Sequence, residues 1–295
     1  MRTNAAGYPP VPLEGDWYFE TERLGFAQGV HVRDRLYRID TPFQRIEILD
    51  TEGFGRALVL DTALQTTEGD EFMYHEMLVH VPLMTHPRPT RVLIIGGGDG
   101  GTLRRVLEHQ MTEPTQVEID AEVIDACKQY APGISRGALE DVRARVLVED
   151  GIPFMRENPG GFDVVIVDST DPVGPAVQLF DVPFYKDVAR SLADDGLMAA
   201  QSSSPLFMAD DLRQQAANMR EAFPIVRTYV GSVPTYPGAL WSYTIGSKRY
   251  DPLTVSRDVI AERLTENGIE TRYYSPEIHH AAFVLPPFVA DIVGS

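Results

Sequence analysis

A chain of 295 residues is long enough for one large domain and a smaller one, and its apolar content of 43% is ordinary for a globular protein. The formal net charge of −17 argues against nucleic acid or an anionic membrane as a partner, and it is compatible with cationic ligands. A single cysteine, Cys127, excludes an internal disulfide framework, and its helical context indicates a small core residue rather than a nucleophile.

Neither a signal peptide nor a membrane span is predicted. The N-terminal residues lack the apolar stretch of a secretion signal, and no segment reaches the roughly 18 apolar residues that a membrane helix needs. We therefore expect a cytoplasmic protein that makes no contact with a membrane.

Residues 17 to 68 carry the pattern of a small antiparallel sheet. Polar and apolar residues alternate in three segments separated by turn residues, namely 30–33, 44–48 and 57–64. Such alternation predicts strands with one covered face, and a second subunit is one candidate for the cover. We expect residues 1–69 to form this β domain.

The composition changes after Gly69. A helix pattern opens with acidic residues and is stopped by Pro87, and strand and helix patterns then alternate in the way that builds a parallel sheet. The strands are predicted at 91–96, 115–120, 142–149, 162–168, 196–201, 225–233 and 241–247. The later helices are predicted at 102–109, 121–130, 151–157, 183–193 and 209–223. Residues 70–295 thus read as an α/β domain with a seven-stranded, doubly wound, methyltransferase-like (Rossmann-type) sheet that has an antiparallel hairpin at one edge.

The first strand of this domain runs into a glycine-rich loop. Gly96, Gly98 and Gly101 have the G-x-G-x-x-G spacing that is typical of a turn where a nucleotide approaches the main chain. The only large side chain of the loop is Asp99, and a carboxylate there repels a pyrophosphate and favours a ligand with positive charge. The loop therefore predicts a nucleotide-like ligand that lacks phosphate.

Acidic residues follow the next two strands, at the sheet edge where ligands bind. Glu118 ends the second strand, where a carboxylate can accept both ribose hydroxyls. Asp150-Gly151 follows the third strand, where an acceptor suits the adenine amino group. Singly, each aspartate in such a place is more commonly a helix N-cap, but together these residues predict an adenosine pocket.

The fourth strand ends in Asp168, and Asp171 follows in a proline-bracketed loop. Near Asp99 they would form a strongly negative pocket, which a diammonium or a sulfonium would fill. An amine nucleophile must lose a proton from an ammonium whose pKa is roughly 10, so a carboxylate at the strand end suits a general base. The competing use is a metal site, but Mg²⁺ favours phosphate co-ligands that Asp99 would repel.

His75-Glu76 resembles the start of the zinc motif H-E-x-x-H. The next histidine, His80, is one residue too far along, so the two imidazoles lie roughly 140° apart around a helix and cannot share a metal. Tyr74 and His75 could instead offer a hydroxyl and an imidazole to a ligand, the alternative being ordinary helix–sheet packing.

With these motifs assembled, the sequence resembles the polyamine aminopropyltransferase family, the spermidine synthases, from Trp17 to the tail at 278–286. The matching pieces are Asp61, Gln65, 67–68, 70–72, 74–77, 96–101, 117–120, 150–151, 168–175 and 234–237. The resemblance implies transfer of an aminopropyl group from decarboxylated S-adenosylmethionine to putrescine, giving spermidine and methylthioadenosine, without a cofactor or metal. It also implies a homodimer or homotetramer.

The resemblance assigns a role to each site residue. Asp168 is implied to be the general base. The residues implied to bind the donor are Gln44, Asp99, Glu118, Asp150, Gly151 and Pro175. Those implied to face the acceptor amine are Tyr74, His75, Asp171 and Tyr236.

Three positions depart from the family pattern. Ser203 stands where many relatives carry glutamate, Ala239 where a glycine is expected, and His280 where Lys or Arg is usual. The first two concern the acceptor side, so agmatine, cadaverine or spermidine stay open as acceptors. Three competing functions also stay open: a methyltransferase, a nicotinamide dehydrogenase and a non-catalytic polyamine-binding paralogue.

Overall fold

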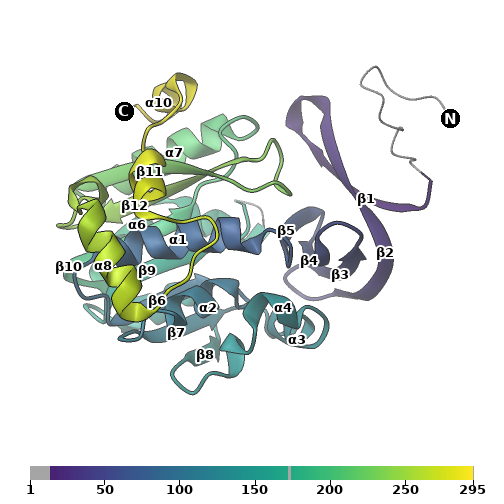
Figure 1. Ribbon diagram of the computed structural model, residues 1–295, viewed down its shortest axis with the longest axis horizontal. Coiled ribbons are helices and arrows are strands. Elements are labelled where there is room, and N and C mark those ends of the chain that lie inside the picture. Colours follow the sequence, from purple (N-terminus) through teal and green to yellow (C-terminus); the bar gives the residue numbers. More distant parts are fainter. Residues whose placement is uncertain (1–13, 172–173, 295) are drawn as a thin grey trace.

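The structure, a computed structural model, describes residues 14–171 and 174–294. Two sheets organise the chain (Figure 1). The N-terminal sheet has five antiparallel strands in the order of the sequence: β1 (Asp16–Glu22), β2 (Phe26–Asp40), β3 (Arg45–Thr51), β4 (Gly55–Leu60) and β5 (Ala63–Thr67).

The second sheet has seven strands in the order β11-β12-β10-β9-β6-β7-β8. Its strands are β6 (Arg91–Gly96), β7 (Glu113–Glu118), β8 (Arg145–Val148), β9 (Phe162–Asp168), β10 (Leu192–Gln201), β11 (Ile225–Ser232) and β12 (Leu240–Ser247). The first five are parallel, and β12 and β11 are antiparallel at one edge, which confirms the predicted sheet and its hairpin. The strand order reverses between β6 and β9, and this is where ligands bind in such sheets.

Helices cover both faces of the second sheet. Because side chains alternate along a strand, Val92 and Ile94 of β6 pack toward α1 and α2, whereas Leu93 and Ile95 pack toward α5 and α6. The helices are α1 (Glu71–Thr85), α2 (Gly101–Leu107), α3 (Ala121–Tyr130), α4 (Pro132–Ser135), α5 (Gly151–Glu157), α6 (Val182–Ser191), α7 (Ala209–Arg220), α8 (Arg257–Asn267), α9 (Pro276–Ala281) and α10 (Pro287–Val293). No helix in the described residues is both long and apolar enough to span a membrane.

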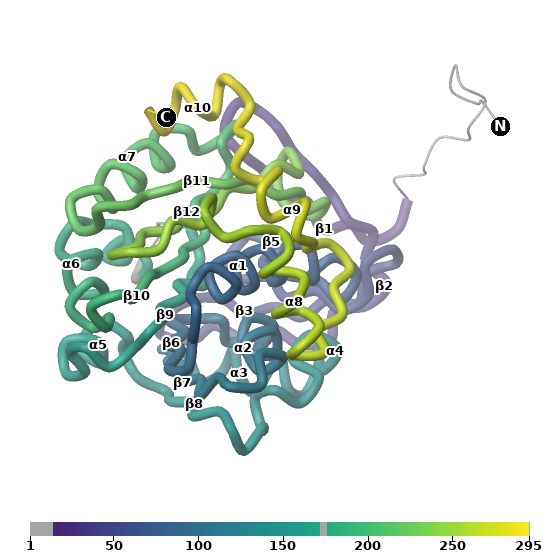
Figure 2. The backbone as a smooth tube through the Cα atoms, turned by 60° about the vertical axis from the view of Figure 1, so that its left-hand side comes forward, coloured from purple at the N-terminus to yellow at the C-terminus, as the bar shows by residue number. Residues whose placement is uncertain are grey.

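The C-terminal helices were not predicted. In α8 only Ile260 is fully buried, so the helix has too few apolar positions for a periodic signal. α10 packs against α7, which Figure 2 shows at the same end of the molecule. The connecting segment is held by Glu76 of α1, whose carboxylate accepts hydrogen bonds from the backbone N–H groups of Arg272, Tyr273 and Tyr274.

The expectation of one covered face in the N-terminal sheet is wrong. Consecutive residues of β3 and β4 are buried, which requires cover on both faces. One face packs on the chain's own α3 and α4, where Cys127 is a fully buried core residue as predicted. On the other face Tyr18 of β1 joins residues of β2 to β5, and its hydroxyl donates to the Thr62 carbonyl at 2.7 Å. The sheet therefore curls so that its first strand contacts the turn between its last two strands.

Candidate active site

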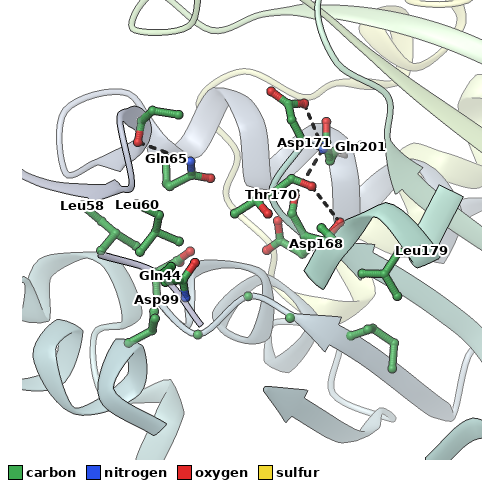
Figure 3. Close-up of a pocket in the computed structure, with 18 of the residues that line it drawn as sticks. Gln44, Leu58, Leu60, Gln65, Asp99, Asp168, Thr170, Asp171, Leu179 and Gln201 are labelled. Carbon is green, nitrogen blue, oxygen red and sulfur yellow. Dashed lines mark hydrogen bonds between the residues drawn. The ribbon is translucent and has the colours of Figure 1, made fainter. Parts of the chain in front are cut away.

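A cavity of about 260 Å³ opens at the carboxyl ends of the parallel strands. The β6 and β9 ends form one side, and residues of the N-terminal sheet such as Leu58, Leu60 and Gln65 form the other (Figure 3). The cavity lies at the point where the strand order reverses, as the sequence predicts for a ligand site.

Carboxylates dominate the wall of this cavity. Among the described residues that line it there is no lysine or arginine, and His75 is the one basic side chain. The lining carboxylates are Glu20, Glu22, Asp99, Glu118, Asp150, Asp168 and Asp171. Such a wall attracts cations and repels phosphate.

The glycine loop after β6 fits tightly against the end of β9. The backbone N–H of Gly97 donates to the Asp168 carbonyl at 2.8 Å. Gly96 has a φ of +84°, and a Cβ there would lie 2.2 Å from the same carbonyl oxygen. Only glycine allows this approach, so the loop and the strand end form one rigid unit.

Asp168 lies near the centre of the cavity, with Gln44 and Asp99 to one side and Asp171 and Gln201 to the other (Figure 3). One carboxylate oxygen accepts a hydrogen bond from the Tyr74 hydroxyl at 2.7 Å. The other accepts from the Thr102 hydroxyl, also at 2.7 Å. The sequence analysis did not predict Thr102 as a site residue. The local indication of this role is its position directly after the glycine motif, at the start of α2.

Asp99 is buried at 8% exposure and accepts a hydrogen bond from the Gly101 N–H at 2.7 Å. Its other neighbour is the imidazole of His75, with Nε2 3.5 Å from Oδ1. Burial raises the pKa of Asp99 although His75 opposes the rise. The ligand atoms of His75, Asp99 and Asp168 lie within 4.8 Å of one another, which is close enough for all three side chains to surround one cation.

His75 is oriented by Glu71 of the same helix. Its Nδ1 lies 3.0 Å from the Glu71 carboxylate, which also accepts a hydrogen bond from Arg104 at 2.6 Å. Burial alone would lower the pKa of His75, but Glu71 and Asp99 outweigh it and raise the pKa above its usual value. Burial would raise the pKa of Glu71, but His75, Arg104 and Arg105 lower it to about 2.

Glu118 is buried where β7 ends. Its carboxylate accepts hydrogen bonds from the backbone N–H groups of Gly98 at 3.2 Å and Asp120 at 2.9 Å. Burial raises the pKa of Glu118 to about 7, although hydrogen bonds from backbone N–H groups, among them that of Asp120, oppose the rise. Asp120 itself does not line the cavity and caps α3 by accepting from the Glu122 N–H at 3.1 Å.

Three other residues predicted to bind the nucleoside, Gln44, Asp150 and Gly151, also line the cavity. Asp150 lines the cavity and also caps α5, because its carboxylate accepts a hydrogen bond from the Ile152 N–H at 2.9 Å. One residue thus has both of the roles that the sequence presented as alternatives. Gly151 lines the cavity, and Gln44 does so while its amide donates to the Asp120 carboxylate at 3.2 Å. The side chain of Pro175 lies outside the described part of the structure.

The other end is formed by Asp171 and Tyr236. Asp171 accepts hydrogen bonds from the Ser203 hydroxyl at 2.6 Å and the Gln201 amide at 3.4 Å. Burial raises the pKa of Asp171, although these two hydrogen bonds oppose the rise. Tyr236 lines the cavity and donates its hydroxyl hydrogen bond to the Gln65 carbonyl.

The three unusual positions differ in their relation to the cavity. Ser203 does not line the cavity, but its hydroxyl donates a hydrogen bond to Asp171, which does. Ala239 has a φ of +58°, which explains the expectation of glycine there. His280 lies away from the cavity wall, with its ring nitrogens 3.0 Å from the carbonyl oxygens of Pro276 and Val255.

Glu20 and Glu22 were not predicted as site residues. They come from β1, which the sequence does not connect with the sheet that carries the other acids. The alternation of Tyr18, Glu20 and Glu22 on one strand face is the only local signal.

Comparisons with known proteins identify the family to which the chain belongs. Residues 71–257 match the spermine/spermidine synthase domain, and residues 16–68 match the spermidine synthase tetramerisation domain. A polyamine aminopropyltransferase from Caldicellulosiruptor saccharolyticus is 50% identical over 280 residues, which cover 94% of this chain and 98% of the relative. One from Moorella thermoacetica is 46% identical over 282 residues, which cover 95% of this chain and 97% of the relative.

Solved structures extend the comparison. A crystal structure of spermidine synthase in complex with the transition-state analogue AdoDATO is 38% identical, with a TM-score of 0.91 and coverage of 96% of this chain and 97% of that chain. Spermidine synthase from Thermotoga maritima is also 38% identical, with a TM-score of 0.90 and coverage of 96% of both chains. From its domains, its relatives and its fold, the chain belongs to the spermine/spermidine synthase family and is a polyamine aminopropyltransferase.

Proposed function

We propose that this enzyme transfers the aminopropyl group of decarboxylated S-adenosylmethionine to putrescine, giving spermidine and methylthioadenosine. The observation that carries the proposal is the cavity wall, which has seven carboxylates and, among the described residues, no lysine or arginine. A sulfonium donor and a diamine acceptor are both cations without phosphate, so they suit this wall. The solved spermidine synthase with a bound transition-state analogue supports the same reaction.

The proposed reaction begins when Asp168 accepts a proton from the acceptor ammonium, which frees the electron pair on nitrogen. The nitrogen then bonds to the aminopropyl carbon next to sulfur, while the C–S bond breaks and its electron pair stays on sulfur. The leaving group is a neutral thioether, so the reaction needs no general acid, cofactor or metal. The protein contributes alignment of nitrogen, carbon and sulfur, and stabilisation of the two cations.

The donor is assigned to the end of the cavity that contains the glycine loop. Asp99 would bind the ammonium of its aminopropyl group, and Glu118 the ribose hydroxyls. The residues proposed to surround the nucleoside are Gln44, Asp150, Gly151 and Pro175. Intact S-adenosylmethionine would bring a carboxylate toward Asp99, so the buried acid favours the decarboxylated donor.

The acceptor is assigned to the opposite end, with its reacting nitrogen at Asp168. Asp171 would bind the distal ammonium of putrescine. The other residues proposed to face the acceptor are Tyr74, His75 and Tyr236. The Tyr74 hydroxyl also holds Asp168, so it would orient the base as well as contact the amine.

The test is turnover of the purified protein with decarboxylated S-adenosylmethionine and putrescine, followed by mass spectrometry of both products. We expect equal amounts of methylthioadenosine and spermidine. Parallel reactions with cadaverine, agmatine and spermidine identify the preferred amine. No turnover with any of the four amines would overturn the proposal, and methyl transfer from intact S-adenosylmethionine would indicate a methyltransferase instead.

The match to a tetramerisation domain indicates an oligomer. We propose a homotetramer rather than a homodimer, and light scattering of the purified protein distinguishes the two. The cytoplasmic location stays a prediction.

A further inference from the structure

Glu71 lies one helical turn before His75 and does not line the cavity, whereas His75 does. Both side chains are almost completely buried. The Nδ1 atom of His75 faces the Glu71 carboxylate at 3.0 Å, and Nε2 has no hydrogen-bond partner among the described residues. His75 thus connects the cavity to a carboxylate that the proposed reaction does not use.

The Glu71 carboxylate is ionised because two arginines of α2 face it. One of its oxygens accepts a hydrogen bond from Arg104 at 2.6 Å and lies 3.5 Å from the guanidinium of Arg105. Burial would raise the pKa of Glu71, but His75 and these arginines lower it to about 2. An ionised carboxylate accepts hydrogen bonds and cannot donate one, so its contact with Nδ1 requires a proton on that nitrogen. Nε2 is therefore the ring nitrogen at which His75 gains or loses a proton.

The imidazole of His75 is held in one orientation by its neighbours. Gly101 at the start of α2 leaves room for the ring, since a Cβ there would lie 2.2 Å from Cε1. With Nδ1 held by Glu71, Nε2 lies 3.5 Å from Oδ1 of Asp99. The ring therefore presents Nε2 to the place where Asp99 is proposed to bind the aminopropyl ammonium.

A proton on Nε2 and a bound ammonium compete for the same place. The ligand atoms of His75, Asp99 and Asp168 lie within 4.8 Å of one another. Burial opposes a charge on His75, but Glu71, Asp99 and Asp168 outweigh it and raise the pKa of His75 above its usual value. An ammonium that entered between these side chains would meet an imidazolium, and two cations in contact repel each other. A neutral imidazole would instead accept a hydrogen bond from the ammonium.

We propose that Glu71 is a positioning residue that acts through His75 when the donor binds. By holding a proton on Nδ1, Glu71 leaves the exchangeable proton of His75 on Nε2, where the aminopropyl ammonium of the donor displaces it. This proton passes to the solvent, and Nε2 then accepts an N–H of the ammonium that Asp99 binds. The inference rests on the proposed function and adds to it the release of a proton on donor binding.

The experiment measures proton release by calorimetric titration at pH 6.5, in buffers that differ in their enthalpy of ionisation. The ligand is decarboxylated S-adenosylmethionine. Methylthioadenosine, which lacks the aminopropyl ammonium, corrects for protons released at nucleoside contacts such as Glu118. In the wild type we expect the donor to release more than about half a proton beyond methylthioadenosine, because the pKa of His75 is raised above 6.5. The Kd of the donor relative to that of methylthioadenosine should then fall about fourfold or more from pH 6 to pH 8.

Three variants assign this proton, and a fourth is the matched control. Glu71→Gln should lower the extra release by about half or more, because an amide neither fixes the proton on Nδ1 nor stabilises a charged ring. Glu71→Asp keeps the charge that faces Arg104 and Arg105, so it preserves folding while it withdraws the carboxylate from Nδ1, and its release should also fall. His75→Gln should abolish the extra release. Glu108→Gln should keep it, because Glu108 also pairs with Arg105, at 2.9 Å, and does not line the cavity.

The outcomes separate the inference from the function on which it rests. Equal proton release with the donor and with methylthioadenosine overturns the inference, while turnover of the wild type leaves the proposed function intact. Wild-type release in both Glu71 variants also overturns it, because Glu71 would then only neutralise the arginines. Release that persists in His75→Gln overturns it as well, since the proton would come from a carboxyl group. If the wild type neither binds nor converts the decarboxylated donor, it is the proposed function that fails.

Discussion

Asp168 differs from the other acids of the cavity in how its oxygens are held. Each oxygen accepts one hydrogen bond from a neutral hydroxyl, Tyr74 on one side and Thr102 on the other. A carboxylate oxygen has two lone pairs, so each keeps one for the proton of an amine. Asp150, by contrast, uses an oxygen to cap a helix. Orientation by two hydroxyls suits Asp168 to its proposed role as the base.

Replacing this carboxylate tests the assignment. Asp168→Asn is expected to bind methylthioadenosine within about threefold of the wild type and to lower kcat by about 10² to 10⁴, because an amide cannot accept the proton. Calorimetric titration and steady-state kinetics measure the two quantities. Thr102→Val, which keeps the carboxylate and removes one orienting hydrogen bond, should lose only about tenfold in kcat. Turnover of Asp168→Asn near the wild-type rate would contradict the assignment.

The sequence predicts those site residues that lie at the ends of recognisable strands. Asp99 lies just after the apolar strand β6, and Glu118 and Asp168 are the last residues of β7 and β9. Parallel strands bring their carboxyl ends to one edge of the sheet, so the sequence indicated both the chemistry and the position of these residues. Glu71 was not recognised as a site residue, because its contact with Arg104 exists only once α1 packs on α2. Its spacing of four residues from His75 on the same helix is a local signal. Glu20 was not recognised either, because only the folded chain brings β1 to the cavity.

Among the elements, the strands of the second sheet were predicted best. The predicted and observed limits of β6 and β9 are identical, because both are continuous apolar runs that are buried on two faces. The limits of β8 were predicted less well, at 142–149 against Arg145–Val148, because this edge strand is only partly buried. In the N-terminal sheet, the alternation of polar and apolar residues correctly indicated strands. The curl that buries both faces of the sheet could not be predicted, because it depends on contacts between β1 and the turn after β4.

The turn from Tyr236 to Ala239 holds a non-glycine residue in a strained backbone conformation. Ala239 has a φ of +58° and the adjacent Gly238 has a φ of +73°. Ala239→Gly is expected to raise the free energy of unfolding by about 0.5 to 1 kcal/mol, because glycine adopts this backbone conformation without a steric cost.

The neighbouring position provides the matched comparison. Gly238→Ala should lower the free energy of unfolding by about 1 kcal/mol or more, since its Cβ would also lie 3.1 Å from the ring of Phe207. Urea unfolding of both variants measures the two signs. A destabilised Ala239→Gly variant would show that Ala239 gains more from its contacts than it loses to strain.

At the scale of the whole molecule, the cavity combines two sheets that the sequence presents separately. The hydrogen bond from Gln28 to Thr235 joins residues 207 positions apart in the chain. No local sequence pattern predicts such a contact. The residues at the proposed donor end of the site could therefore be predicted more completely than those at the acceptor end. The two sheets also bury carboxyl groups of the cavity wall. Because burial shifts their pKa values, the free energy of unfolding depends on pH.

Glu118 gives this dependence a definite sign. Folding raises the pKa of the Glu118 carboxyl from 4.5 to about 7, so the folded state favours the protonated form. The stability that the protonated Glu118 contributes is therefore lost as the pH rises from about 4.5 through 7. Glutamine cannot ionise. Between pH 5 and pH 8, the free energy of unfolding of Glu118→Gln should therefore rise by about 1 to 3 kcal/mol relative to the wild type.

Urea unfolding at the two pH values measures this difference, and any constant offset from altered hydrogen bonds cancels. Glu149→Gln removes an exposed carboxylate from the residue whose backbone N–H donates to the Glu118 carbonyl at 3.0 Å, and it controls for the loss of a charge as such. A difference between Glu118→Gln and the wild type that is the same at both pH values would contradict the expected burial effect.

The hydrogen bond between Gly97 and the carbonyl of Asp168 has a consequence for how this enzyme could change. It locks the donor loop to the base within one sheet, whereas Glu20 and Glu22 belong to the hairpin of β1 and β2 in the other. The residues proposed to transfer the aminopropyl group thus belong to a different sheet from this part of the cavity wall. Mutations in the hairpin therefore change one wall of the cavity without altering the contact between the glycine loop and the end of β9.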